Sequence, residues 1–315
     1  RSLNGKKLWW NNRLKNMKIP SVTVKQLLEA GVHLGHKTYR WNPKMSKFIF
    51  GSKNSIHIID LVQTLELANA ALNEIHKCIS SGGKVLFVST KKQAAETIAN
   101  LAKDTSQFYV NHRWLGGMLT NWKTISNSIK RLKKLTADLK EENTGFTKKE
   151  NLKMGMQRDK LERSIGGIAD MTKIPDMIFI IDTNVEELAV KESIRLNIPI
   201  VAIVDSNSDP TGINFPIPGN DDARRAINLY CDLIKQTILD AQKNITSIDK
   251  DEKKVAIGDK TEEQQKETKQ EKTEIKKEKI DVKKTKSKKE KIKTVKKISK
   301  SILSKVKSLT AKKTK

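Results

Sequence analysis

The stretch Asp176-Met177-Ile178-Phe179-Ile180-Ile181-Asp182 decides the fold class. Its five consecutive apolar residues leave no polar face, so we expect a strand that is buried on both sides. Lys84–Ser89 and Pro199–Asp205 have the same form. Phe108–Val110 and Asn214–Ile217 predict two shorter strands, the second at a sheet edge because it contains proline.

Helical patterns alternate with these strands. Asp60 predicts the cap of a helix through Ile79, with apolar residues at helical spacing. Further helices are expected at 91–104, 185–196 and 220–243. Buried strands that alternate with helices are typical of an α/β fold built on a doubly wound parallel sheet.

Two smaller elements precede the first buried strand. Thr23–Ala30 predicts a short helix that Gly31 ends. The β-rich runs Phe48–Phe50 and Ile56–Ile59 flank a polar turn and predict a hairpin.

A heptad pattern interrupts the alternation of strands and helices. Apolar positions repeat in steps of four and three, and they are Met118, Leu119, Trp122, Ile125, Ile129, Leu132, Thr136 and Leu139. A turn at Asn143–Gly145 and a capping box at Thr147 and Glu150 predict a return helix. Residues 118–168 are therefore expected to form an inserted antiparallel coiled-coil hairpin, an arm that projects from the sheet domain.

Charge divides the chain into three parts. The whole chain carries +26, and residues 248–315 hold 25 Lys against 12 acidic residues. We expect this segment to be a disordered, Lys-rich basic C-terminal tail, because it has no aromatic residue with which to build a core. Residues 17–247 form the predicted domain. Residues 1–247 together hold 37 basic and 24 acidic residues, a net charge of about +13, so the chain is basic even without its tail. Residues 1–16 are a basic N-terminal extension of little consequence, with organellar targeting as the alternative.

The cationic balance favours a polyanionic partner, and nucleic acid above all. Cys78 and Cys231 lie far apart and form no CxxC spacing, so we expect a reducing compartment and no metal or disulfide framework. No apolar run approaches the roughly 20 residues that span a bilayer, so we expect no membrane partner.

The segment Asn111–Lys123 carries the clearest functional signal. It reads NHRWLGGMLTNWK and combines two tryptophans, cations, amides and paired glycines. Cations neutralise phosphates, aromatic rings stack on bases and glycine lets a backbone approach closely. This mixture favours a surface that meets RNA.

Several segments resemble the small-subunit ribosomal protein S-two family, of bacterial and organellar type. They are Gly31–His36 with Trp41–Met45, Asn111–Lys123, Pro175–Asp182 through Glu192 to Pro199, Asp205–Pro210, and Ile217–Ala223. They occur in the family's order and cover about residues 17–245. The resemblance implies a flavodoxin-like sheet domain with a coiled-coil arm.

The resemblance also implies a structural constituent of the small ribosomal subunit that supports translation. Its expected partners are small-subunit ribosomal RNA and other ribosomal proteins, including the messenger-RNA-capturing S-one protein that it would dock. The expected location is the ribosome in the cytoplasm, with an organellar ribosome as the alternative. A standalone RNA- or DNA-binding regulator on the same fold is the competing class.

We expect RNA contacts from four places: the segment Asn111–Lys123, the arm, the loop that follows His36, and the residues that follow the first buried strand. The residues are Arg40, Trp41, Lys44, Lys91, Lys92, Asn111, His112, Arg113, Trp114, Asn121, Trp122, Lys123, Lys130, Arg131 and Lys134.

No enzyme, small-molecule substrate or cofactor is expected, because no phosphate loop or nucleophile–base spacing can be found. A metal site is not expected either. The weak alternative joins His36 to Asp182 and Asp205 at strand ends.

Overall fold

A computed structural model of the chain describes residues 20–140 and 147–244. The expectations for the extension 1–16, for the tail 248–315 and for the turn Asn143–Gly145 lie outside the described residues.

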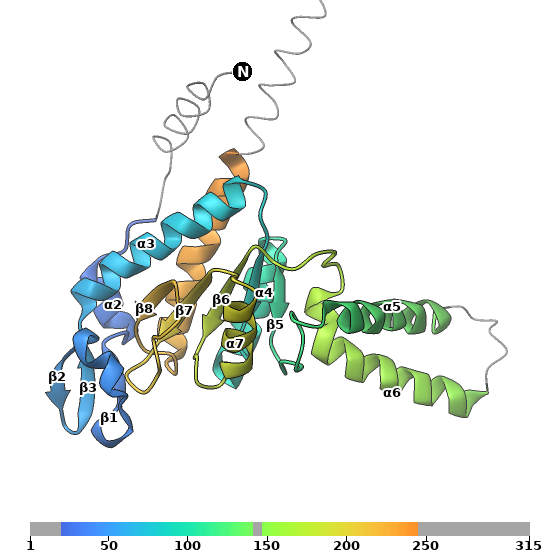
Figure 1. Cartoon of the computed structure of the whole chain (residues 1–315), viewed down its shortest axis with the longest axis horizontal. Helices are drawn as coiled ribbons and strands as arrows, with labels where there is room; N and C mark the ends of the chain where they lie inside the picture. The colour runs from blue at the N-terminus through green and yellow to red at the C-terminus, as the bar shows by residue number, and fades with distance from the viewer. Residues whose placement is uncertain (1–19, 141–146, 245–315) are drawn as a thin grey trace, which may run out of the picture. The chain divides into compact units, whose positions relative to one another are not determined.

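Five parallel strands form the central sheet (Figure 1). They are β4 (Val85–Val88), β5 (Phe108–Val110), β6 (Met177–Ile181), β7 (Ile200–Val204) and β8 (Phe215–Pro218). Their spatial order is β5-β4-β6-β7-β8. The strand order therefore reverses at β4: β5 is added on one side of β4, and β6, β7 and β8 are added on the other. This is the flavodoxin-like order, and the α/β fold class and the proline-containing edge strand β8 are confirmed.

Both faces of this sheet are buried, as its unbroken apolar strands predict. Alternate residues point to opposite faces, so Phe87 and Phe179 enter one apolar cluster and Leu86 and Ile178 enter the other. Phe87 and Phe179 lie on adjacent strands and pack against each other on the same face, with ring centroids 5.8 Å apart.

Helices cover each face. The first face holds α2 (Val24–Ala30), α3 (Leu61–Ser80), α4 (Lys92–Asp104) and a last helix at residues 224–244. The other face packs against α7 (Glu187–Arg195) and the base of the arm. The expected cap at Asp60 is confirmed. The short helix begins one residue later than expected, because Thr23 is its cap. None of the helices in the described ranges is sufficiently long and apolar to span a bilayer.

The last helix starts later than the sequence predicts. The side-chain oxygen of Asn220 accepts hydrogen bonds from the backbone N–H groups of Asp222 and Ala223. These residues therefore form the capping turn and the helix begins at residue 224.

A second, three-stranded antiparallel sheet lies beside α2 and α3 (Figure 1). The expected hairpin is present as β2 (Ile49–Lys53) and β3 (Ile56–Ile59). The sequence analysis did not predict its third strand, β1 (Leu34–Lys37), which pairs with β3. Two short 3-10 segments, Thr38–Arg40 and Pro43–Phe48, connect β1 to β2.

The inserted arm consists of α5 (Trp122–Asp138) and α6 (Lys148–Ile165), which lie side by side and extend from the β5 edge (Figure 1). Ile125, Ile129 and Leu132 are buried along its seam, and the capping box at the start of α6 is confirmed. The expected seam is wrong at its beginning. Met118 and Leu119 precede the helix and are buried in the loop under its base.

The arm returns to the sheet at Gly167, where two backbones meet. A Cβ atom at this position would lie 2.1 Å from the backbone oxygen of Tyr109 on β5. Glycine is therefore required at position 167 by the close approach of two backbones. It is not required by a left-handed helix cap, because the C-cap residue Gly166 has a right-handed helical backbone conformation.

We expect Gly167→Ala to lower the free energy of unfolding by roughly 1–3 kcal/mol or more, because rigid backbone must shift. Gly155→Ala is the matched control, since its Cβ meets nothing within 4 Å inside α6. There alanine should stabilise the helix by up to about 1 kcal/mol. Chemical denaturation measures both values, and equal stability of the two variants would contradict the close approach.

Candidate functional site

The motif Asn111–Lys123 forms the loop between β5 and α5, and only part of it faces outward. His112, Arg113, Asn121 and Lys123 are exposed. Asn111 is half-buried and its amide donates to the backbone oxygen of Ala95 at 3.2 Å. The loop therefore presents Arg113 and Lys123 at the foot of the arm, together with the exposed amide of Asn121, whose oxygen accepts a hydrogen bond from the Thr124 hydroxyl.

The burial of Trp114 contradicts the expectation that its ring stacks on RNA. Its side chain is only 6% exposed and belongs to the apolar cluster beneath the sheet. Trp122 is half-buried against the same cluster, so at most one edge of it is available. Neither tryptophan presents a full ring face to a base.

The indole N–H of Trp114 and four further donors of the loop converge on Glu192 of α7. The backbone N–H groups of Gly117, Leu119 and Thr120 donate to this carboxylate, and so does the Thr120 hydroxyl. Burial would raise the pKa of Glu192, but these hydrogen bonds outweigh burial and hold the pKa below its ordinary value. The sequence analysis missed this role, because a single acid on a helix carries no local signal.

The arm continues the cationic surface of the loop. Helices α5 and α6 contain eleven basic residues, five and six respectively, against four acidic ones. Lys130, Arg131 and Lys134, which the sequence analysis selected, are all exposed. Arg131 also donates to Gln157 on α6 at 3.2 Å, which orients its guanidinium across the pair of helices.

Arg40, Trp41 and Lys44 are also exposed, but they lie on the segment between β1 and β2, and not on the arm or its loop. The Trp41 ring packs against His57 with centroids 5.4 Å apart. Lys44 Nζ forms an ion pair with Asp209 at 2.7 Å, and hydrogen bonds from Lys44 and Thr211 lower the pKa of Asp209 to about 2. This second surface is therefore only partly free to neutralise phosphate.

Lys91 contradicts its predicted contact with RNA. Its ammonium lies 2.7, 2.8 and 2.7 Å from carboxylate oxygens of Asp182, Asp221 and Asp222. Burial would lower the pKa of Lys91, but the three carboxylates outweigh burial and raise it. Its neighbour Lys92 is exposed and remains a candidate.

The Lys91 cluster occupies the switch point of the sheet. Lys91 follows β4 and Asp182 follows β6, the two strands between which the chain reverses direction. Doubly wound folds bind their ligands in the crevice at this point. Here an internal ion network fills it, and the backbone N–H of Thr90 donates to the buried Glu186 at 2.6 Å.

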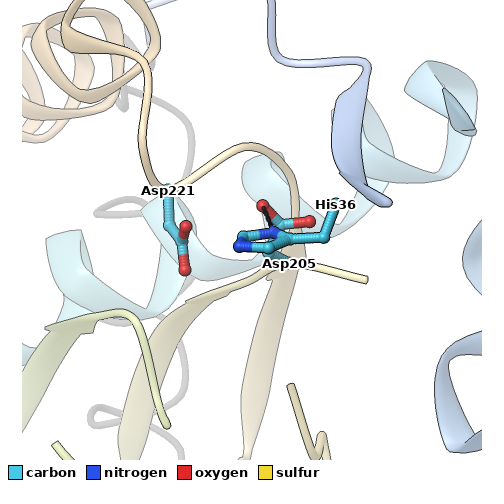
Figure 2. A group of neighbouring side chains, drawn as sticks. All are labelled: His36, Asp205 and Asp221. Carbon is cyan, nitrogen blue, oxygen red and sulfur yellow. Dashed lines mark ion pairs between the residues drawn. The ribbon is translucent and has the colours of Figure 1, made fainter. Parts of the chain in front are cut away.

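His36 joins a second cluster beside the first (Figure 2). Its Nδ1 lies 3.0 Å from Asp205, and the hydrogen bond to Asp205 raises the pKa of His36. One ligand atom each from His36, Asp205 and Asp221 lies within 4.8 Å of the others. The second carboxylate oxygen of Asp221 is buried and has no hydrogen-bond partner in the described parts of the chain.

Imidazole nitrogen and carboxylate oxygen are both zinc ligands, so these three donors could together hold a divalent cation. The triad differs from the weak alternative of the sequence analysis in one residue. Asp221 from the loop after β8 lies in the triad in place of Asp182, and it also forms an ion pair with Lys91 at 2.8 Å. Nothing in the local sequence around Asp221 distinguishes it from a helix-capping acid.

Comparison with known proteins identifies the chain's relatives. The family model described as ribosomal protein S2 matches residues 27–241. The chain belongs to this family. Among curated proteins, the small ribosomal subunit protein uS2 of Parvibaculum lavamentivorans is 58% identical over 224 residues, which cover 71% of this chain and 88% of the relative. The uS2 proteins of Sinorhizobium medicae and Agrobacterium fabrum match with the same identity and coverage.

Membership of the family makes the chain a ribosomal protein of the small subunit, a structural component of the ribosome and not an enzyme. The sequence analysis identified this family correctly.

We expect Lys91→Met to lower the free energy of unfolding by about 3–5 kcal/mol at pH 7, because it leaves three carboxylates without their cation. Burial already raises the pKa of Asp221 to about 7, and loss of the Lys91 ammonium, which lowers it, should raise the pKa of Asp221 further. As pH falls, the folded variant would take up protons before the unfolded chain does. The loss in free energy of unfolding relative to the wild type should therefore shrink between pH 7 and pH 5. Denaturant unfolding of Lys91→Met and of the exposed control Lys92→Met tests this; a deficit that does not change with pH would contradict it.

We expect Zn²⁺ to bind with one equivalent per chain and to raise the melting temperature. A free concentration 100-fold above Kd corresponds to about 2.7 kcal/mol of stabilisation. His36→Ala and Asp205→Asn should lose both effects, whereas the exposed His112→Ala should keep them. Affinity should fall as pH is lowered, because a protonated His36 cannot be a ligand. Titration calorimetry decides the matter, and equal zinc uptake by His36→Ala would overturn this assignment.

Proposed function

We propose that the chain binds small-subunit ribosomal RNA through the loop Asn111–Lys123 and the arm, and so helps to assemble the subunit. The observation that carries this proposal is the continuity of exposed cations. Arg113 and Lys123 at the foot of the arm lead into Lys130, Arg131 and Lys134 on α5.

The distribution of charge favours RNA over an acidic protein as the partner of this surface. Eleven basic residues against four acidic ones extend along both helices, and RNA offers a phosphate at every nucleotide along such a surface. Few bases can be read, because Trp114 is buried and Trp122 is half-buried. The proposed mode is therefore recognition of phosphate spacing and RNA shape, assisted by Asn121 and His112.

A second part of the proposal concerns the messenger-RNA-capturing S-one protein. The segment from β1 to β2 presents Tyr39, Trp41 and Phe50, which are 71%, 40% and 80% exposed. Exposed aromatic rings of this kind are enriched at protein interfaces. We assign S-one docking to this surface, with Arg40 beside Tyr39 as its polar edge. The bacterial relatives favour a bacterial-type ribosome in the cytoplasm as the setting.

The arm carries a direct test. Replacing Lys130, Arg131 and Lys134 together by alanine should reduce the salt slope of RNA binding by about three and weaken binding at a fixed low salt concentration. Replacing Lys25, Lys77 and Lys103 removes the same charge from α2, α3 and α4 and should leave the slope nearly unchanged. Footprints on small-subunit ribosomal RNA across a salt series give both quantities.

The result distinguishes the proposal from its competitors. An unchanged slope in the arm variant would sink the RNA assignment. A standalone regulator would leave small subunits in a high-salt wash, whereas the proposed component stays with them. Reduced S-one content in subunits that carry Tyr39→Ala and Phe50→Ala, with the chain itself retained, would support the second surface; normal content would refute it.

A further inference from the structure

Glu192 is a buried anion that one loop surrounds. It lies on α7 and is only 9% exposed. Five hydrogen bonds reach its two oxygens, and all five donors lie between Trp114 and Thr120. No Lys, Arg or His in the described ranges forms an ion pair with it, so hydrogen bonds alone compensate its charge.

The loop has few other bonds that could define its shape. Within it, the backbone N–H of Met118 donates to Leu115 and that of Asn121 donates to Gly117. Gly117 has φ of +79°, so its conformation is one that other residues rarely adopt. Three of the backbone N–H groups between these bonds reach only the Glu192 carboxylate. An arrangement of converging N–H groups around an anion is a nest, and here the anion is part of the protein.

Exposed polar residues of the motif, two of them cations, lie on either side of this nest. Arg113 precedes Trp114, and Asn121 and Lys123 follow Thr120. The side chains of Met118 and Leu119 are buried, and the backbone N–H groups of Gly117, Leu119 and Thr120 donate to Glu192. A backbone held in this way fixes the spacing between the cations before and after the loop.

We infer that Glu192 is a positioning residue for RNA binding: it touches no RNA, and it holds the loop so that Arg113, Asn121 and Lys123 meet phosphates in register. This inference rests on the proposed function. Its cause is preorganisation, since a loop that is already ordered loses less conformational freedom on binding.

Glu192→Gln is the sharpest variant. Glutamine keeps the size and shape of the side chain but replaces one acceptor oxygen by an NH₂ group that can only donate. One carboxylate oxygen accepts two of the five hydrogen bonds and the other accepts three. At least two donors of the loop therefore lose their acceptor in the variant and face another donor instead.

Glu186→Gln is the matched control. Glu186 is a second buried glutamate just before α7, but its partner is the backbone N–H of Thr90 and not the loop. Trp114→Phe is a second variant, which removes one of the five donors together with part of a buried ring, and it remains informative if Glu192→Gln folds poorly.

The experiment joins two measurements at a temperature where every variant is folded by circular dichroism. Hydrogen exchange of peptides that cover 114–121 should be at least tenfold faster in Glu192→Gln, with the β6 peptides unchanged. Binding to small-subunit ribosomal RNA should weaken about tenfold, and about threefold in Trp114→Phe. Glu186→Gln should match the wild type in both measurements.

Each outcome has one meaning. A wild-type chain without a specific RNA footprint overturns the proposed function, and the inference with it. A specific footprint whose affinity is unchanged in Glu192→Gln and in Trp114→Phe overturns the inference alone. Faster exchange together with weaker binding, both absent from the control, supports it.

Discussion

Burial of both faces of the central parallel sheet is the constraint on which the other features depend. The strands β4, β6 and β7 contain only apolar residues, so helices must cover the sheet on each side. Polar chemistry is then confined to the ends of the strands and to the loops. The two clusters of charge, around Lys91 and around His36, lie at the carboxyl ends of β4, β6 and β7 for this reason.

The same geometry separates this chain from the nucleotide-binding members of its fold class. Doubly wound sheets commonly bind a ligand where the chain reverses direction. Here Lys91 supplies the positive charge at that point, and Asp182, Asp221 and Asp222 supply the negative charge. The three carboxylates outnumber the one ammonium, so the crevice keeps an excess of negative charge, which disfavours an anionic nucleotide there.

Much of the fold could be predicted from the sequence because its signals are local. The unbroken apolar strands and the capping residues Thr23, Asp60 and Thr147 determine elements through neighbours within a few positions. The strand β1 was missed, because LGHK has no β-rich pattern and pairs only through β3. The sequence analysis placed the start of the last helix too early, at Asn220. In the structure Asn220 belongs to the capping turn, and the helix begins at residue 224.

The candidate site was less predictable, because its residues meet across long distances in the sequence. Composition alone placed Trp114 and Lys91 on a binding surface, since tryptophan and lysine suit RNA. Their actual partners are Glu192, 78 positions away, and Asp221, 130 positions away. No local pattern encodes such pairs, whereas the exposed cations of the arm follow directly from helical periodicity.

The motif Asn111–Lys123 shows why its composition was both informative and misleading. Its inward residues, Trp114, Met118 and Leu119, fasten the loop to the sheet domain. Its outward residues, Arg113, Asn121 and Lys123, are left at fixed separations by that attachment. A loop that both packs and binds needs apolar and cationic residues in alternation, together with glycine where the backbone turns at Gly117. The mixed composition thus belongs to a loop whose inward residues pack on the sheet domain and whose inward donors meet a carboxylate on another element, Glu192.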